Sequence, residues 1–422
     1  MEANMFSVAK KFAEASTKSP DTTAVPQTTS VPVPSCLLRP IATKPTFLMG
    51  TGPTNFSQRV SEALCKPLMG LYMDETHYIM DEIKEGLRYI FQTKNSVTYC
   101  SSCSGNGGIE SVLFNLVEEG DVVLFGVTGD FGRRAVNIGR LLGADVRVLE
   151  ATLGTVLKYE QIRGHVELYR PKILYLVHGE SSCGVLQSLV GLGDLCRRYD
   201  CLLVIDAVST AGAVEFLVDE WKIDAAFAAS QKVLGAPAGL APITLSERAM
   251  QKIHNRKTPV KSYYWDAVLL SSKWGCQGES RMKHHTVSLM VLYGLRESLA
   301  EICEQGLESF RNRHSENAIR LQKGLQSMGL ELFVQNPEER LPTITAVRIP
   351  YGVNWNKVSD YLLESFSLEV SSGFGRTEDM IFRIGLMNSN ATYRRVDYVL
   401  NALREALRVT CNYAPPTGSV YY

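Results

Sequence analysis

One lysine near the middle of the chain stands in an unusually apolar setting. Lys232 is the single charged residue in residues 225–243, a segment built mostly from Ala, Leu, Gly and Pro. An ammonium group among hydrocarbon neighbours loses solvation, which lowers its pKa and makes the neutral amine nucleophilic. Such an amine is suited to form a Schiff base with an aldehyde. The alternative is a strand end from which Lys232 reaches water.

A second isolated charge precedes it in the chain. Asp206 ends the apolar stretch LLVID, where a carboxylate is costly unless it meets a cation. Pyridoxal phosphate chemistry needs an amine that captures the aldehyde and an acid that pairs with the protonated ring nitrogen. Asp206 and Lys232 therefore predict a pyridoxal phosphate site at the carboxyl ends of strands. For Asp206 alone, a helix N-cap is the alternative.

Small residues directly precede a predicted helix over residues 109–117. The sequence Ser-Gly-Asn-Gly-Gly at residues 104–108 exposes backbone N–H groups where the helix dipole favours an anion such as a phosphate. A glycine-rich turn alone is a weak signal, since most such turns only reverse the chain. The pattern is not the G-x-G-x-x-G of dinucleotide sites.

An arginine lies within an apolar predicted strand, residues 380–387. The planar guanidinium of Arg383 can bind a carboxylate through two parallel hydrogen bonds. Its partner is either an internal Asp or Glu or the α-carboxylate of an amino acid substrate. The lysine, the acid, the phosphate turn and this arginine together are far more specific than any one of them.

The chain resembles the class V, fold-type I pyridoxal-phosphate aminotransferases, most closely their alanine–glyoxylate/serine–pyruvate group. The similarity runs from about residue 49 to residue 407. It rests on residues 50–54 (GTGPT), 79–93 (IMDEIKEGLRYIFQT), 178–182 (HGESS), 230–232 (SQK), 274–276 (WGC), 284–286 (HHT) and 383–385 (RIG).

The resemblance implies a role for each matching position. Lys232 would bind the cofactor aldehyde and move protons, Asp206 would pair with the ring nitrogen, and Arg383 would bind the substrate carboxylate. Ser181 would contact the ring hydroxyl and Phe131 would stack on the ring. The phosphate would be held by Ser104, Gly105, Asn106 and Gln231 and, from the second subunit of a homodimer, by Lys283 and Thr286.

Three positions depart from the family pattern. Asn106 replaces a His in the phosphate turn, and Phe131 replaces a Trp but keeps an aromatic face. Lys283 stands where a Tyr normally donates to the phosphate. It can bind phosphate as a point charge, but it could also compete for the aldehyde. The turn at residues 69–72 lacks the Ser-Asn pair of kynurenine-type enzymes, which favours small substrates.

We therefore expect transamination between a small amino acid, alanine or serine, and glyoxylate or pyruvate. Two alternatives stay open at this point. One is a 3-hydroxykynurenine–glyoxylate transaminase, which would act on a bulky aromatic amino acid. The other is a catalytically weak paralogue that binds pyridoxal phosphate and serves as a structural or regulatory dimer.

The elements that must position these residues alternate between helices and short apolar strands. Strands are predicted at residues 121–126, 144–150, 173–178, 202–206 and 225–230. Short strands that are apolar on both faces belong to a mostly parallel sheet covered by helices on both sides. We expect an α/β large domain over residues 47–305, and the resemblance implies seven strands in its sheet.

The pattern changes after residue 305. Strands are predicted at residues 330–334, 343–350, 368–371 and 380–387, and helices at 310–330, 356–366 and 392–409. This order suggests a smaller α+β domain over residues 306–422. Residues 1–46, rich in Pro and Thr, are expected to form a flexible extension.

Composition excludes several other classes of protein. The 44 Lys and Arg balance 44 Asp and Glu without a basic cluster, which argues against nucleic-acid binding. The apolar runs are much shorter than the ~20 residues of a membrane helix. The C-x-x-C at residues 100–103 has no second Cys or His pair, so we expect no metal site. We expect a mitochondrial or cytoplasmic location, since the C-terminus is not a peroxisomal signal.

Overall fold

The structure is a computed structural model that describes residues 31–278 and 281–413. The chain divides into two compact units, residues 1–44 and residues 45–422. The described part of the first unit contains one 3-10 turn, η1 (Ser35–Leu38), and its side chains are exposed. The predicted extension over residues 1–46 lies mostly outside the described residues and stays a prediction.

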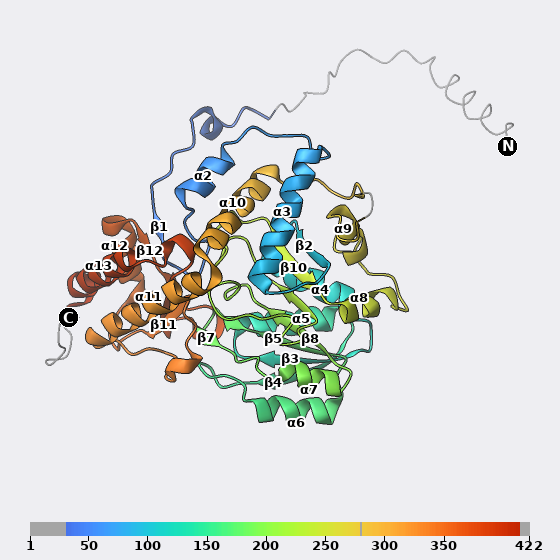
Figure 1. Ribbon diagram of the computed structural model, residues 1–422. Helices are drawn as coiled ribbons and strands as arrows, with labels where there is room; N and C mark the ends of the chain where they lie inside the picture. Colours follow the sequence, from blue (N-terminus) through green and yellow to red (C-terminus); the bar gives the residue numbers. More distant parts are fainter. Residues whose placement is uncertain (1–30, 279–280, 414–422) are drawn as a thin grey trace, which may run out of the picture. The chain divides into compact units, whose positions relative to one another are not determined.

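A seven-stranded sheet forms the centre of the second unit (Figure 1). Only β10 runs antiparallel to its neighbours, so the expected α/β fold with a mostly parallel seven-stranded sheet is confirmed. The strands, in spatial order, are β2 (Val97–Ser101), β10 (Ala241–Leu245), β9 (Ala225–Phe227), β8 (Leu202–Asp206), β5 (Ile173–Val177), β3 (Val122–Val127) and β4 (Asp145–Glu150).

The central strands of the sheet end at residues that are paired in register. Val177 pairs with Asp206, and Asp206 pairs with Phe227, so β5, β8 and β9 present their last residues at one edge. All residues of β5 and β8 are buried, which explains their unbroken apolar sequences. The predicted strands do not include β2 and β10, whose Thr, Ser and Pro residues interrupt the apolar pattern.

Helices cover both faces of this sheet. Helices α4 and α5 connect strands in the direction from β2 towards β4, whereas α6 and α7 connect strands in the direction from β4 back towards β8. Because such crossovers are right-handed, the two pairs of helices lie on opposite faces. Contacts agree: α4 touches α5, and α6 touches α7 (Figure 1). These helices are α4 (Gly105–Leu116), α5 (Asp130–Leu141), α6 (Tyr159–Tyr169) and α7 (Leu192–Arg198).

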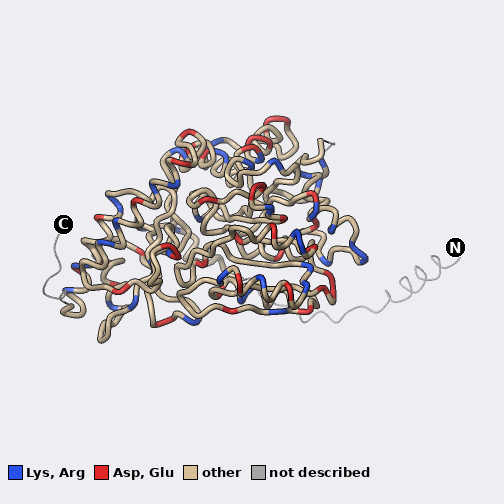
Figure 2. The backbone as a smooth tube through the Cα atoms, turned by 60° about the horizontal axis from the view of Figure 1, so that its bottom comes forward, with Lys and Arg blue, Asp and Glu red and all other residues tan. Residues whose placement is uncertain are grey.

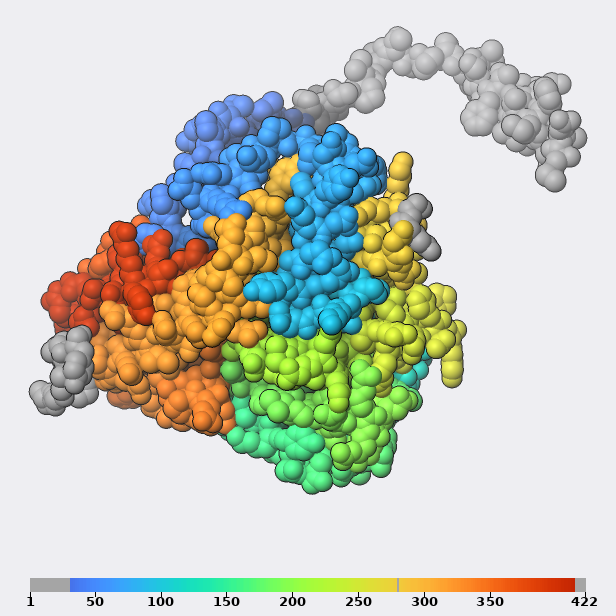
Figure 3. All heavy atoms as spheres, viewed as in Figure 1, coloured from blue at the N-terminus to red at the C-terminus, as the bar shows by residue number. Residues whose placement is uncertain are grey.

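Another group of helices packs beside β2 and β10. Helix α10 contacts α2 and α3, and Figure 3 shows the orange surface of α10 beside the blue surface of α3. The group comprises α2 (Gln58–Leu64), α3 (Asp74–Phe91), α8 (Glu247–His254), α9 (Ala267–Lys273) and α10 (Leu289–Gln305).

The C-terminal part has its own hydrophobic core around a three-stranded antiparallel sheet, β11-β14-β13. Trp355 stacks on Phe382 in this core with ring centroids 4.1 Å apart. The elements are α11 (Leu307–Ser327), β11 (Ile344–Arg348), α12 (Trp355–Phe366), β12 (Leu368–Glu369), β13 (Ser371–Ser372), β14 (Ile381–Gly385) and α13 (Tyr393–Cys411).

Two details differ from the sequence prediction. Residues 330–334 do not form a strand; Leu332 makes only an isolated bridge to Val347. β1 (Phe47–Leu48) pairs with β12, and Met49 belongs to the C-terminal core, although both precede the large sheet in the chain. Nothing tests the predicted boundary between residues 305 and 306, which stays a prediction.

Short elements complete the fold, and charges are dispersed over it. A hairpin joins β6 (Gly179–Glu180) to β7 (Val185–Leu186), and single turns are η2 (Pro337–Glu339), η3 (Gly375–Thr377) and η4 (Asn388–Asn390). Lys and Arg are interspersed with Asp and Glu along the described part of the chain (Figure 2). Among the described residues, every helix is too short or too polar to cross a bilayer.

Candidate active site

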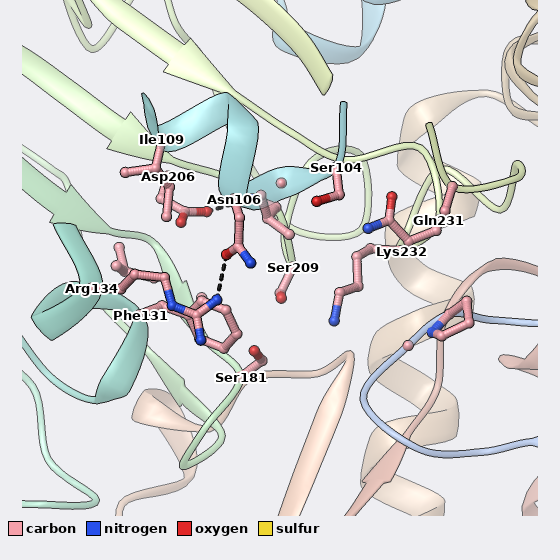
Figure 4. Close-up of a pocket in the computed structure, with 17 residues that line it drawn as sticks. Ser104, Asn106, Ile109, Phe131, Arg134, Ser181, Asp206, Ser209, Gln231 and Lys232 are labelled. Carbon is pink, nitrogen blue, oxygen red and sulfur yellow. Dashed lines mark hydrogen bonds between the residues drawn. The ribbon is translucent and has the colours of Figure 1, made fainter. Parts of the chain in front are cut away.

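A cavity of about 280 Å³ opens at the carboxyl edge of the sheet (Figure 4). Parallel strands place their carboxyl ends and the following loops at one edge, where ligands of open α/β sheets bind. Eight of the eleven residues predicted for the site line this cavity. They are Ser104, Gly105, Asn106, Phe131, Ser181, Asp206, Gln231 and Lys232.

Lys232 extends from the loop after β9 towards the middle of the cavity (Figure 4). Its amine donates a hydrogen bond to the backbone carbonyl of Thr51. Burial, reinforced by the charge of Arg383, lowers the pKa of Lys232 to about 8, although Asp206 acts in the opposite direction. The amine is therefore neutral far more often at physiological pH than an ordinary lysine, as its sequence context predicts.

Asp206 is the last residue of β8, and its side chain is only 3% exposed. Its carboxyl accepts one bond of 2.9 Å from the Val208 N–H and a long one of 3.5 Å from the Tyr175 hydroxyl. Burial raises the pKa of Asp206 to about 7, and the nearby Glu180 adds to the rise. A cation placed beside this carboxyl would restore its ionised form.

The phosphate turn is part of a helix rather than a loop before one. Helix α4 begins at Gly105, not at Ile109 as predicted, so the glycines form its first turn and their N–H groups face the cavity end of the helix. Ser104 is the N-cap residue, yet its hydroxyl makes no capping bond. A Cβ on Gly108 would lie 2.9 Å from the Phe227 ring, so only glycine lets α4 approach the sheet.

Two further groups complete the polar wall. The buried amide oxygen of Gln231 lacks a hydrogen-bond partner within the described part of the chain. A rotation of this amide by half a turn would put its NH₂ group, which has two N–H donors, at the position of the oxygen. Asn106 accepts a hydrogen bond from Arg134, as the dashed line in Figure 4 shows.

The other three predicted residues do not line the cavity. Arg383 is buried in β14, where it donates to the carbonyls of Ser372 and Ser181. The Lys283 ammonium lies 5.0 Å from the ring centroid of Tyr72, and Thr286 is exposed. The roles assigned to Arg383, Lys283 and Thr286 stay predictions.

Several other residues line the cavity that were not predicted for the site, notably Gly52, Arg134 and Ser209. Gly52 belongs to the GTGPT motif and has φ +104°; a Cβ there would lie 2.6 Å from Lys232 Cδ. Arg134 follows Phe131 by one helical turn, which puts both on one face of α5. Ser209 follows Asp206 in the loop after β8. Arg134 and Ser209 each follow a predicted site residue by three positions, Phe131 and Asp206 respectively, and this spacing could have indicated them from the sequence.

The fold and these groups suit pyridoxal phosphate. The α4 N-terminus, the uncommitted Ser104 hydroxyl and the Gln231 amide can hold a phosphate, Asp206 can pair with a ring cation, and Lys232 can meet an aldehyde. The geometry thus defines the class of pyridoxal-phosphate enzymes. The family described as aminotransferase class V matches residues 48–394, and the chain belongs to this family.

Individual relatives agree over nearly the whole chain. An alanine–glyoxylate aminotransferase of Drosophila melanogaster is 49% identical, covering 89% of this chain and 95% of that protein. The crystal structure of an alanine–glyoxylate aminotransferase from Nostoc sp. is 39% identical with a TM-score of 0.85, covering 88% of this chain and 97% of that one.

A relative of different name is almost as similar. The ureidoglycine–glyoxylate aminotransferase structure from Bacillus subtilis is 38% identical with a TM-score of 0.87, covering 90% of this chain and 97% of that one. The predicted class, fold, enzyme type and cofactor are confirmed: this is a pyridoxal-phosphate aminotransferase.

The pKa of Lys232 predicts how cofactor binding depends on pH. For protein freed of cofactor, the rate of pyridoxal phosphate binding should rise about tenfold per pH unit well below pH 8, because only the neutral amine reacts, and level off above it. Stopped-flow absorbance measures this rate. Lys232→Ala is the control and should show no such phase. A midpoint near the ordinary lysine value of 10.5 would contradict the assignment.

Proposed function

We propose that this protein transfers the amino group of a small amino acid, alanine or serine, to glyoxylate or pyruvate. The observation that carries the proposal is that the Lys232 amine and the Asp206 carboxyl, both with shifted pKa values, line one small cavity. The similarity to proteins named alanine–glyoxylate aminotransferase supports the choice of substrates. The turn at residues 69–72, which lacks the Ser-Asn pair of kynurenine-type enzymes, favours a small substrate over a large aromatic one.

Pyridoxal phosphate, when bound, supplies an electron sink for the pair released when the substrate Cα loses its proton. Asp206 would support this function by pairing with a positive charge at the ring nitrogen, in a buried place where water cannot compete. Ser104 and the N–H groups of the first α4 turn would hold the phosphate. Phe131 would offer its aromatic side chain to the ring.

Lys232 is the group that moves the proton. An amine with a pKa of about 8 exchanges protons readily near neutral pH, which is the requirement for a general acid and base. The Thr51 carbonyl holds the amine at the cavity while it is not otherwise engaged. Because Gly52 has no side chain that would collide with Lys232, the amine and this carbonyl can approach closely.

Arg383 is the candidate for binding the substrate carboxylate. Its Nε and Nη2 atoms donate to the Ser372 carbonyl at 2.9 and 2.7 Å, and Nη1 donates to the Ser181 carbonyl at 2.9 Å. Each Nη atom carries a second N–H, so two donors remain for a carboxylate. The three bonds to carbonyls fix the plane of the guanidinium in advance.

A substrate panel tests the proposed reaction. We expect turnover of alanine or serine with glyoxylate or pyruvate, and at least a hundredfold lower kcat/KM for 3-hydroxykynurenine, because residues 69–72 lack the Ser-Asn pair of kynurenine-type enzymes. Lys232→Ala should lose this activity, whereas Lys222→Ala, a change to an exposed lysine paired with Asp194, should keep it. A preference for the aromatic donor would favour the kynurenine alternative. Absence of turnover in cofactor-loaded protein would favour the weak paralogue.

The role of Arg383 is tested by comparing two affinities. Arg383→Ala should raise KM for the amino acid by at least tenfold while changing cofactor affinity much less, since the guanidinium does not line the cofactor cavity. Arg348→Ala is the control, because Arg348 lies on the neighbouring strand and pairs with Glu331 at the surface. Equal losses of both affinities would contradict substrate binding by Arg383.

We further propose that the enzyme is a homodimer whose subunits share each active site. The predicted phosphate-binding residues Lys283 and Thr286 lie outside their own cavity and are exposed, which suits contact with a second subunit. A partner that supplies these residues would also complete the cavity wall. Amino acids and 2-oxo acids are the small-molecule partners of such an assembly.

Mixing two inactive variants tests the shared site. Lys232→Ala and Thr286→Asp should each have little activity, the second because its carboxylate repels the phosphate. After subunit exchange the mixture should recover about a quarter of wild-type activity, since half the dimers are mixed and each has one intact site. Activity that stays at the average of the two separate variants would mean that each subunit builds its own site.

A further inference from the structure

One fully buried carboxylate beside the cavity is not used by the reaction as described. Glu180 is 0% exposed and does not line the cavity, but it ends β6 and directly precedes Ser181. One carboxyl oxygen accepts from the N–H groups of Phe131 and Gly132 at 3.2 and 3.3 Å. The other accepts from the Ser182 N–H at 3.1 Å and the Ser182 hydroxyl at 2.6 Å.

These four bonds favour an ionised carboxylate. Three of the four partners are backbone N–H groups, which can only donate, and the fourth is the Ser182 hydroxyl, which donates here but could also accept. The N–H groups of Phe131 and Gly132 lie in the first turn of α5, where the helix dipole also stabilises a negative charge. Burial raises the pKa of Glu180, while the bonds from Ser182 and Gly132 oppose that rise.

Glu180 thereby connects three parts of the site. It holds the backbone of Phe131, the aromatic residue of the cavity wall. It also fixes the loop in which the Ser181 side chain faces the cavity (Figure 4) and the Ser181 carbonyl accepts from Arg383. Ser182 extends the connection, because its hydroxyl accepts from the Asp130 N–H at 3.0 Å.

Close packing leaves this carboxylate little freedom. A Cβ on Gly129 would lie 2.4 Å from the Glu180 Cγ and 2.4 Å from the Ser182 hydroxyl. The backbone of Gly129 is extended, with φ −174°, so space rather than conformation requires glycine at this position. The start of α5 and the Ser181 loop are thus locked against each other through Glu180.

We propose that Glu180 is a positioning residue, which sets the distance between Phe131 and Ser181 and so the place of the cofactor ring between them. The proposal rests on the pyridoxal phosphate site of the proposed function but not on the identity of the amino donor. Glu180 acts through other residues, and its negative charge also lies near Asp206 and Arg383.

The test is Glu180→Gln in the full-length protein reconstituted with pyridoxal phosphate. Glutamine keeps the shape but replaces one acceptor oxygen by a donor, so one pair of N–H or O–H donors loses its partner. Cofactor affinity should fall on the order of tenfold. At saturating cofactor, the visible circular dichroism of the bound ring should change and kcat should fall more than KM rises. Glu180→Asp should not restore the cofactor affinity, because the aspartate side chain is shorter by one methylene and its carboxylate cannot reach the same donors.

Asp224→Asn is the matched control. Asp224 is also 0% exposed and accepts bonds from Leu203, Ser246 and Arg248, but it lies at the opposite, amino end of the strands. The Asp224→Asn variant should have lower thermal stability than the wild-type protein, while its cofactor affinity and visible dichroism stay at wild-type values. Glu180→Gln protein with those same wild-type values would overturn the proposal.

Ser182→Ala keeps the proposal testable if Glu180→Gln does not fold. It removes the 2.6 Å bond to Glu180 without removing the charge, so smaller losses in the same two measurements are expected. Wild-type cofactor affinity and dichroism in this variant would overturn the proposal. If wild-type protein binds pyridoxal phosphate but fails to transaminate alanine, the proposed substrates are wrong, and the Glu180 measurements still stand.

Discussion

The site depends on two ionisable groups that the fold buries without a full set of partners. Asp206 and Lys232 each have a pKa shifted against the charged form, mainly through burial. Their ionised states are therefore disfavoured in the folded protein, and the site costs stability when no ligand is bound. A cation beside Asp206 and an aldehyde at Lys232 remove both penalties at once. The same two buried groups thus cost stability and favour cofactor binding.

The parallel sheet makes this arrangement possible. Because β5, β8 and β9 end in register, Asp206 at the end of β8 lies at the same edge as Ser181 and Lys232, which follow β5 and β9. The first turns of α4 and α5 lie at the same edge, because these helices follow β2 and β3. The first turn of α4 provides N–H donors for a phosphate, and the first turn of α5 provides an aromatic wall. Strands that are buried on both faces give this edge a rigid base, and rigidity is what a preorganised electrostatic site needs.

A second layer of contacts holds the site residues themselves. Glu180 ties the start of α5 to the Ser181 loop, and backbone carbonyls hold Arg383 and Lys232. Most of these partners are main-chain groups, so their positions follow from the path of the chain rather than from side-chain identity. This explains why the family motifs contain glycines such as Gly52, where a side chain would displace the lysine.

Sequence alone determined the chemistry, the fold class and eight of the residues that line the cavity. Lys232, Asp206 and the turn after Ser104 were recognisable because charge or glycine in an apolar setting is conspicuous locally. Tertiary structure decided what depends on residues distant in the chain: β10 running antiparallel, β1 joining the C-terminal core, α4 beginning at Gly105, and the Thr51 carbonyl meeting Lys232. The bonds of Glu180 belong to this second group. Periodicity reports local burial, whereas register and packing arise only when separate segments compete for the same space.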